Sequence, residues 1–280
     1  GTSFTSAYTV DASDTDGTVA ISITATDVVG NQTTAFTTIS AGSVTVDQTA
    51  PASQKTQGVV TTGGDNQVAG YWNSGNTGVD ITVPIADDSS INGGTVQLLV
   101  STDGGGSFVP LDTPSTISAV NTNKTISVAS GVLEGVAGFG ESDVLQFKAT
   151  ITDTSGNATT GTVSDTTLTV DQTAATISTS SIASDNATVT LAKTGDTVTL
   201  TIATNENVSS PTVTFTSGGA AATNADTVSG ASPGTSFTSA YTVDASDTDG
   251  TVAISITATD VVGNQTTAFT TISAGSVTVD

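Results

Sequence analysis

Short runs in which apolar and polar residues alternate recur along the chain, and they predict β-strands with one buried face. In residues 196–204 the run sets Val198, Leu200 and Ile202 on one side of an extended chain and threonines on the other. The same alternation occurs in residues 79–85, 145–151 and 252–256. Turn residues separate the runs, and no stretch of helical length has helical periodicity. The pattern therefore predicts an all-β chain built of antiparallel β-sandwiches.

The chain begins and ends with the same sequence. Residues 1–47 recur without a substitution in residues 234–280, at an offset of 233 residues (234 − 1). Because two old domains would have diverged, this identity indicates recent duplication or recombination in a tandem array. We expect the chain to be a window, slightly longer than one period, on a longer array.

A shorter period divides the repeat into two types of module. SVTVDQTAP around Asp47 is similar to TLTVDQTAA around Asp171, and SVTVD ends the chain at Asp280. A loop of the form DxxGN precedes each of these segments. We therefore predict the C-terminal part of one module in residues 1–47, a complete module of a second type in 48–171, and a complete module of the first type in 172–280. Both complete modules have ordinary domain size.

Composition restricts the possible partners and chemistry. The chain has 26 acidic residues against four lysines and no arginine, a net charge of -22, which repels nucleic acid and anionic membranes. It contains no His, Cys or Met, and so lacks the usual general base, the thiolate and the soft metal ligands. We predict no enzymatic activity, no nucleic-acid partner and no membrane insertion in this segment.

At TDVVGNQTT…SVTVDQTAP the sequence resembles the bacterial immunoglobulin-like repeats of giant surface adhesins and filaments, and residues 68–108 are similar to a segment of such repeats. The resemblance implies tandem immunoglobulin-like modules in an elongated string. It also implies an extracellular, cell-surface location and calcium at the domain junctions. One departure is Ala175, which stands where the first junction has Pro51 and is expected to make the second link less stiff.

An immunoglobulin-like plan places the acidic loops in two groups, one at each junction. The first group comprises Asp11, Asp14, Asp16, Asp47, Asp87, Asp88, Asp153 and Asn157. The second comprises Glu141, Asp143, Asp171, Asn205, Glu206, Asp260 and Asn264. Carboxylates that converge repel one another unless a cation lies between them, and a set of oxygen donors alone selects Ca²⁺. We therefore predict calcium ions that bridge neighbouring modules and stiffen the string.

The same residue types are also ordinary turn formers, because Asp accepts backbone N–H bonds and Gly adopts left-handed conformations. For the DxxGN loops alone we favour turn chemistry. For residues 11–17 (DASDTDG) we favour a metal, since a turn needs one Asp and not three. For Asp47 and Asp171 we also favour ligation, because both lie at predicted junctions.

Three functions fit these observations. The first is a stalk that projects an adhesive domain, since the reach of tandem sandwiches grows with repeat number. The second is a self-assembling extracellular filament or surface layer in which identical chains pack together. The third is a glycan-binding module that uses the aromatic pair Tyr71 and Trp72, although a lone Trp is more often a core residue.

Residues 1–47 hold only the last strands of a sandwich, with an apolar face that cannot stay bare in water. The missing strands must come from the polypeptide upstream or from another chain. We favour the upstream polypeptide.

Overall fold

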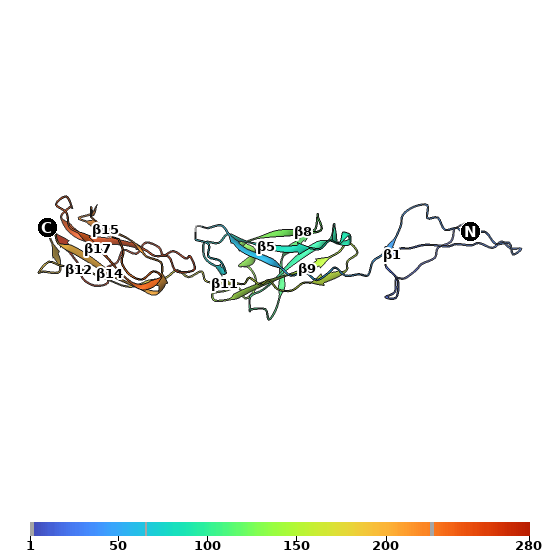
Figure 1. Cartoon of the computed structure of the whole chain (residues 1–280), viewed down its shortest axis with the longest axis horizontal. Helices are drawn as coiled ribbons and strands as arrows, with labels where there is room; N and C mark the ends of the chain where they lie inside the picture. The colour runs from blue at the N-terminus through green and yellow to red at the C-terminus, as the bar shows by residue number, and fades with distance from the viewer. Residues whose placement is uncertain (1–2, 65, 225–226) are drawn as a thin grey trace.

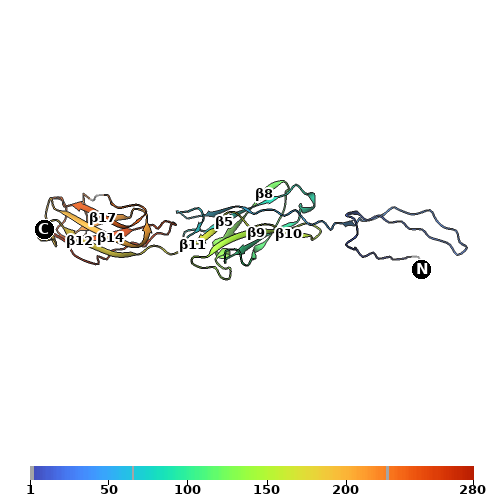
Figure 2. The ribbon, with the colours of Figure 1, turned by 60° about the horizontal axis from the view of Figure 1, so that its bottom comes forward.

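The structure, a computed structural model, describes residues 3–64, 66–224 and 227–280, and it is almost entirely β. Two complete sandwiches and an open N-terminal part follow one another along the long axis in both ribbon views (Figures 1 and 2). The prediction of tandem immunoglobulin-like sandwiches in an elongated string is confirmed.

The central module packs two sheets face to face. One sheet contains β3 (Gln57–Thr62), β5 (Gly78–Ile85) and β8 (Thr122–Ala129) in that order. The other has the order β4 (Tyr71–Trp72), β11 (Leu168–Val170), β9 (Val144–Thr152), β6 (Thr95–Ser101) and β7 (Val109–Thr116), and β10 (Ala158–Thr160) also pairs with β9. Two short helices, η1 (Ser89–Ile91) and α1 (Ser130–Leu133), connect strands. All pairs are antiparallel except β4 with β11.

The C-terminal module repeats this plan. One sheet has the order β12 (Ile177–Ser184), β14 (Thr197–Val208) and β17 (Gly234–Thr242). The other has the order β13 (Leu191–Ala192), β19 (Thr278–Val279), β18 (Gly250–Thr257), β15 (Thr212–Ser217) and β16 (Ala220–Ala221). As in the central module, one short strand, β13, pairs in parallel with the last strand, β19.

Each complete module has its own hydrophobic core. The alternation predicted for β14 is confirmed, since Val198, Leu200 and Ile202 are all fully buried. One core cluster contains residues from Val59 to Val170, and the other contains residues from Ala175 to Val279. The two sandwiches are therefore separately packed bodies joined by a short link.

The N-terminal part is an open fragment of a sandwich. Within residues 3–47 only β1 (Gly17–Thr18) and β2 (Thr45–Val46) are regular strands, and isolated bridges join Ile23 to Phe36 and Thr26 to Gln32. The same sequence forms the long strands β17 and β18 in the C-terminal module. Strand formation therefore depends on the partner strands, not on local sequence alone.

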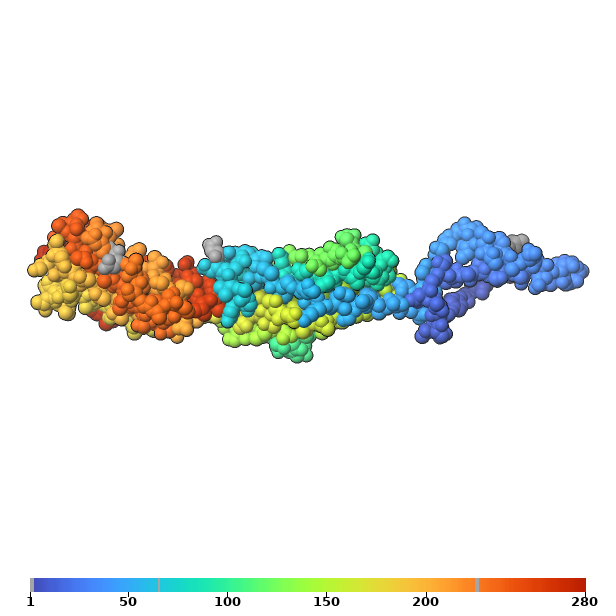
Figure 3. Space-filling model, in the orientation of Figure 1, coloured from blue at the N-terminus to red at the C-terminus, as the bar shows by residue number. Residues whose placement is uncertain are grey.

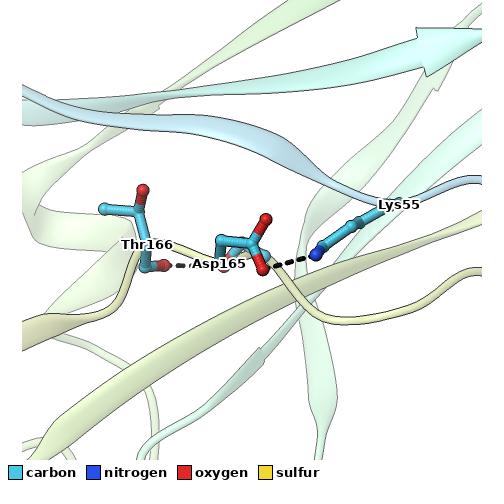
Figure 4. Close-up of polar contacts among 4 residues, drawn as sticks. Lys55, Asp165 and Thr166 are labelled. Carbon is cyan, nitrogen blue, oxygen red and sulfur yellow. Dashed lines mark hydrogen bonds and ion pairs between the residues drawn. The ribbon is translucent and has the colours of Figure 1, made fainter.

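Two further features bear on the surface of the chain. Lys55 and Asp165 form an ion pair on the central module (Figure 4), and because both side chains are exposed the pair contributes little stability. Within the described residues, no helix has the length and apolar character needed to cross a membrane.

Candidate metal site at the junction between the complete modules

The link after β11 is held by hydrogen bonds from both modules. The Asn264 side chain, in the DxxGN loop of the C-terminal module, donates to the main-chain carbonyl oxygen of Asp171 at 2.9 Å. From the central module, Glu141 accepts the backbone N–H of Gln172 at 3.1 Å. We call this pair of contacts the link clamp. It fixes the link relative to both modules at once.

The first junction contains the same clamp. Asn157 donates to the carbonyl oxygen of Asp47 at 3.0 Å, and Asp16 accepts the backbone N–H of Gln48 at 2.8 Å. The two junctions thus use equivalent atoms at both VDQT links. The clamp is a repeated feature of the string and does not belong to one pair of modules.

The DxxGN loop presents its Asn through a tight turn. Asp260 accepts the backbone N–H groups of Val262 and Asn264, both at 2.9 Å, and also the Asn264 side-chain amide at 3.0 Å. Asp260 and Asn264 are buried. The turn chemistry expected for this loop is present, and its Asn also takes part in the junction.

A second loop of the central module packs against this turn. Asn73 donates to the carbonyl oxygen of Val262 at 2.7 Å, and the backbone N–H and hydroxyl of Ser74 both donate to the Asn264 side-chain oxygen at 2.8 Å. The approach is so close that a Cβ on Gly263 would lie 2.2 Å from the carbonyl oxygen of Asn66. The two complete modules are therefore in direct contact. Residues 3–47 contain no counterpart of this loop.

Three carboxylates converge at this junction. One oxygen each from Asp171, Glu206 and Asp260 lies within 4.8 Å of the other two. They come from the link, the end of β14 and the DxxGN loop. One Ca²⁺ with Ca–O distances of about 2.3–2.6 Å could contact all three, and only oxygen donors are present, so the residues fit a calcium site. No other such trio of acidic groups occurs among the described residues.

The acidic groups at the junction act on one another electrostatically. Burial raises the pKa of the Asp171 carboxyl, and the neighbouring Glu141 and Asp260 raise it further. Burial also raises the pKa of Glu206, and Asp260, Asp171 and Glu141 add to the effect. Both shifts mean that the site resists carrying its full negative charge when no cation is bound.

This repulsion predicts a pH dependence in the presence of a chelator. A carboxyl whose folded pKa is raised stabilises the fold below its ordinary pKa, and this stability is lost as pH rises through the folded pKa. We therefore expect the C-terminal module, without calcium, to lose stability as pH rises above about 4, the ordinary range of these carboxyls, and Asp171 and Glu206 ionise. Thermal unfolding in EDTA at a series of pH values measures this. In the Asp171→Asn, Glu206→Gln double variant this loss should be reduced, and an unchanged profile would contradict the assignment.

At the first junction, Asp11, Asp14 and Asp16 do not form one group. Asp11 accepts from the backbone and hydroxyl of Ser13, Asp14 accepts from Tyr8 and from the backbone of Asp11, and Asp16 accepts from Gln48 and Thr49. These bonds lower the pKa of all three carboxyls. The identical residues Asp244 and Asp247 repeat the bonds from Ser246 and from the backbone of Asp244, but the buried Tyr241 hydroxyl has no hydrogen-bond partner among the described residues. The three acids thus act as separate turn and link residues, contrary to the convergence expected for residues 11–17.

The remaining predicted ligands are dispersed. Asp47 accepts from the Ser155 hydroxyl at 2.9 Å, and Asp153 accepts the N–H of Asn157 within its own turn. Asp88 caps η1, and Asp87 is exposed. Asn205 accepts the N–H of Thr176 at 2.6 Å, and Asp143 has a buried carboxylate oxygen with no hydrogen-bond partner among the described residues. Whether any of these residues ligates a cation stays a prediction.

The aromatic pair lies in the core and not on a binding surface. Trp72 is 0% exposed and its indole N–H donates to Glu134 at 3.1 Å, while Tyr71 is half-buried. A buried indole offers no ring face to a sugar. The premise of the glycan-binding alternative, an exposed Trp72, is wrong, and the favoured interpretation as a core residue is confirmed.

The sequence did not point to Asn73, Ser74 or Gln172 as junction residues. Asn73 and Ser74 follow Trp72 in an Asn- and Gly-rich loop, which looked like the rim of a ligand site. The repetition of VDQT at both links, in residues 46–49 and 170–173, was the available signal that the two junctions are built alike.

Comparison with known proteins found only distant likenesses to solved structures. No protein-family model matches it, and no curated protein matches it. The FN1–FN3 domains of chicken CNTN1 are 12% identical over 90% of this chain and 77% of theirs, with a TM-score of 0.31. A tetra-tandem repeat from the extending region of a large adhesion protein is 22% identical over 96% of this chain and 58% of its own length, with a TM-score of 0.29. The D00–D0 domain of intimin is 16% identical over 79% of this chain and 99% of its own, with a TM-score of 0.26. At these identities and TM-scores the likeness carries no information on function.

Proposed function

We propose that the chain is a structural repeat region of an extracellular, cell-surface protein, a stalk whose modules are joined stiffly end to end and whose second junction is braced by Ca²⁺. The observation that carries this proposal is the junction between the complete modules. There the link clamp, the Asn73–Ser74 loop and the Asp171–Glu206–Asp260 trio meet. A string of modules with fixed joints stays extended, and its reach therefore grows with the number of repeats.

Calcium suits this role because of where the three carboxylates come from. Asp171 belongs to the link, whereas Glu206 and Asp260 belong to the C-terminal module. A cation held by all three ties the link to that module, and Glu141 of the central module adds negative charge beside it. Calcium sites of extracellular modules bind with dissociation constants of about 10⁻⁴–10⁻³ M, so such a joint stiffens outside cells.

The tight packing of the junction can be tested with one added methyl group. Gly263→Ala places a Cβ 2.2 Å from the Asn66 carbonyl, while Gly156→Ala, in the matching turn of the central module, meets nothing within 4 Å. The two glycines have similar φ values of +102° and +99°, so the backbone strain is shared. We expect Gly263→Ala to lower the free energy of unfolding by about 1–3 kcal/mol more than Gly156→Ala does, because the added methyl group separates buried hydrogen-bonding groups.

Thermal unfolding and small-angle X-ray scattering of both variants measure this difference. The Gly263→Ala chain should sample a wider range of overall dimensions, whereas the Gly156→Ala chain should scatter like the unsubstituted protein. Equal effects of the two substitutions would mean that this contact does not hold the modules in place, and would contradict the proposal of a stiff joint.

A further inference from the structure

The first and last segments of the central module run side by side in the same direction. Close to the preceding link, Lys55 forms a parallel bridge with Thr162. Close to the following link, β4 pairs in parallel with β11. We call residues 54–56 and 70–72 the first segment, and residues 161–171 the last segment. The two segments thus touch near both ends of the module.

Four main-chain hydrogen bonds join these two segments. In each of them a backbone N–H group of one segment donates to a carbonyl oxygen of the other. The bonds run from Thr162 to Gln54 at 3.0 Å, from Thr56 to Thr162 at 3.3 Å, from Thr169 to Gly70 at 2.8 Å and from Asp171 to Trp72 at 2.9 Å. The exposed ion pair of Lys55 and Asp165 crosses between the same two segments (Figure 4).

The C-terminal module repeats this pairing with a different sequence. Ser181 forms a parallel bridge with Ala274, and β13 pairs in parallel with β19. Four main-chain bonds again join the segments, from Ala274 to Ser180 at 3.1 Å, from Ile182 to Ala274 at 3.0 Å, from Thr278 to Thr190 at 2.9 Å and from Asp280 to Ala192 at 3.0 Å. The arrangement therefore belongs to the plan of the module and not to one sequence.

A glycine allows the close approach of the two segments in each module. A Cβ on Gly161 would lie 1.9 Å from the carbonyl oxygen of Gln54. In the C-terminal module, a Cβ on Gly275 would lie 2.1 Å from the carbonyl oxygen of Ile182. Because a side chain at either position would push the segments apart, these glycines keep the hydrogen bonds short.

A pull along the string acts on these segments in opposite directions. The two links of the central module lie at its opposite ends (Figures 1 and 2), and the complete modules lie in line in the space-filling view (Figure 3). Tension draws the first segment towards the preceding link and the last segment towards the following link. Because the segments are parallel, they would have to slide past one another. All four bonds are then loaded together and do not break one after another.

We propose that the first and last segments of each complete module form a shear lock, which lets the module carry tension along the chain without unfolding. This inference rests on the proposed stalk function and adds a load-bearing role that lies within each module. Forced unfolding is governed by the barrier to unfolding and not by equilibrium stability. A domain of ordinary stability can therefore resist a pull in the one direction that loads the lock in shear.

The direct test is to pull the same module in two directions within the full chain. The chain has no Cys, so cysteines at exposed residues attach the handles of an optical trap. The lengthwise pair, Ser53→Cys with Thr173→Cys, loads the lock in shear. The end pair, Thr77→Cys with Thr173→Cys, pulls both segments from the same end and opens the bonds one by one. At equal loading rate, we expect the lengthwise pair to require a several-fold higher unfolding force.

A matched pair of glycine substitutions tests the lock itself. Gly161→Ala pushes the segments apart near the preceding link, whereas a Cβ on Gly131 in α1 meets nothing within 4 Å. Neither glycine has a left-handed backbone conformation. Gly161→Ala should lower the unfolding force of the lengthwise pair and leave that of the end pair nearly unchanged, because the end pair starts to open at the other end. Gly131→Ala should change neither force.

Equal unfolding forces for the two handle pairs in the otherwise unsubstituted chain would overturn the proposal. It would also be overturned if Gly161→Ala lowered both forces alike, since that would show a general loss of stability. All pulls are made in EDTA, and the C-terminal module lies outside both force paths. A failed shear lock would therefore leave the stiff joint and its calcium site standing, because scattering and the calcium response test those separately.

Discussion

Replacing Trp72 with alanine is expected to lower the free energy of unfolding of the central module by about 3–5 kcal/mol. Trp72 is the largest fully buried side chain, and its indole N–H bonds to Glu134. Alanine would leave a cavity and remove the indole bond to Glu134 Oε1, which would keep only its bond from the Gln172 side-chain amide at 2.8 Å. The backbone carbonyl of Trp72 also accepts the N–H of Asp171 at 2.9 Å, so this core residue lies directly beside the link.

Chemical denaturation followed by circular dichroism measures this effect without relying on the indole as a probe. Trp72→Phe should lower the free energy of unfolding less than Trp72→Ala does, because phenylalanine restores most of the buried volume, although it lacks the N–H bond. Tyr71→Ala, at a half-buried neighbour on the same short strand, is the matched control and should cost less than either Trp72 substitution. A Trp72→Ala chain with nearly unchanged stability would contradict the core assignment.

The second large effect concerns calcium. At a concentration of about 100 times the dissociation constant, Ca²⁺ is expected to stabilise the C-terminal module by about 2.7 kcal/mol. For a module of this size that corresponds to a rise in melting temperature of roughly 10 °C. Burial, and after it the neighbouring carboxylates, raise the pKa of Asp171 and Glu206. The physical reason for the stabilisation is that a bound cation offsets both costs of carrying negative charge at this site.

Glu206→Gln separates this mechanism from unspecific salt effects. Removing one charge from the trio should raise the melting temperature in EDTA and should reduce the gain on adding Ca²⁺. Asp47→Asn is the matched control, because the first junction has a clamp but no carboxylate trio within the described residues, and its calcium response should equal that of the unsubstituted chain. An unreduced rise in melting temperature on adding Ca²⁺ to the Glu206→Gln chain would show that the trio is not the metal site.

The strands could be predicted from the sequence because a half-buried strand leaves a period of two. Val79, Ile81 and Val83 were assigned to one face from alternation alone, and all three are fully buried. Their partners could not be assigned in this way, because cross-strand register is set by contacts distant in sequence. Residues 3–47 show the limit of local pattern. They carry the same alternation as residues 236–280 but form long strands only where residues 172–233 cover them.

The candidate site could be predicted in part. Asp171, Glu206 and Asp260 were grouped from the order of loops in a sandwich, and their carboxylates do converge. Asp11 and Asp14 were grouped by the same rule, but short-range bonds to Ser13 and Tyr8 direct their carboxylates into a local turn. Loop order fixes which end of a module a residue occupies, whereas side-chain direction depends on the nearest hydrogen-bond donors.

The central claim, a stiff joint between the complete modules, is tested most directly by the distance between spin labels on either side of it. The chain has no Cys of its own, so cysteines at the exposed residues Thr122 on β8 and Thr199 on β14 take single labels. Pulsed electron paramagnetic resonance in millimolar Ca²⁺ should give one narrow distance distribution. This distribution should broaden in EDTA and broaden further in the Gly263→Ala chain. A broad distribution in Ca²⁺, unchanged by EDTA and by Gly263→Ala, would show that the modules are joined by a flexible linker and would contradict the account.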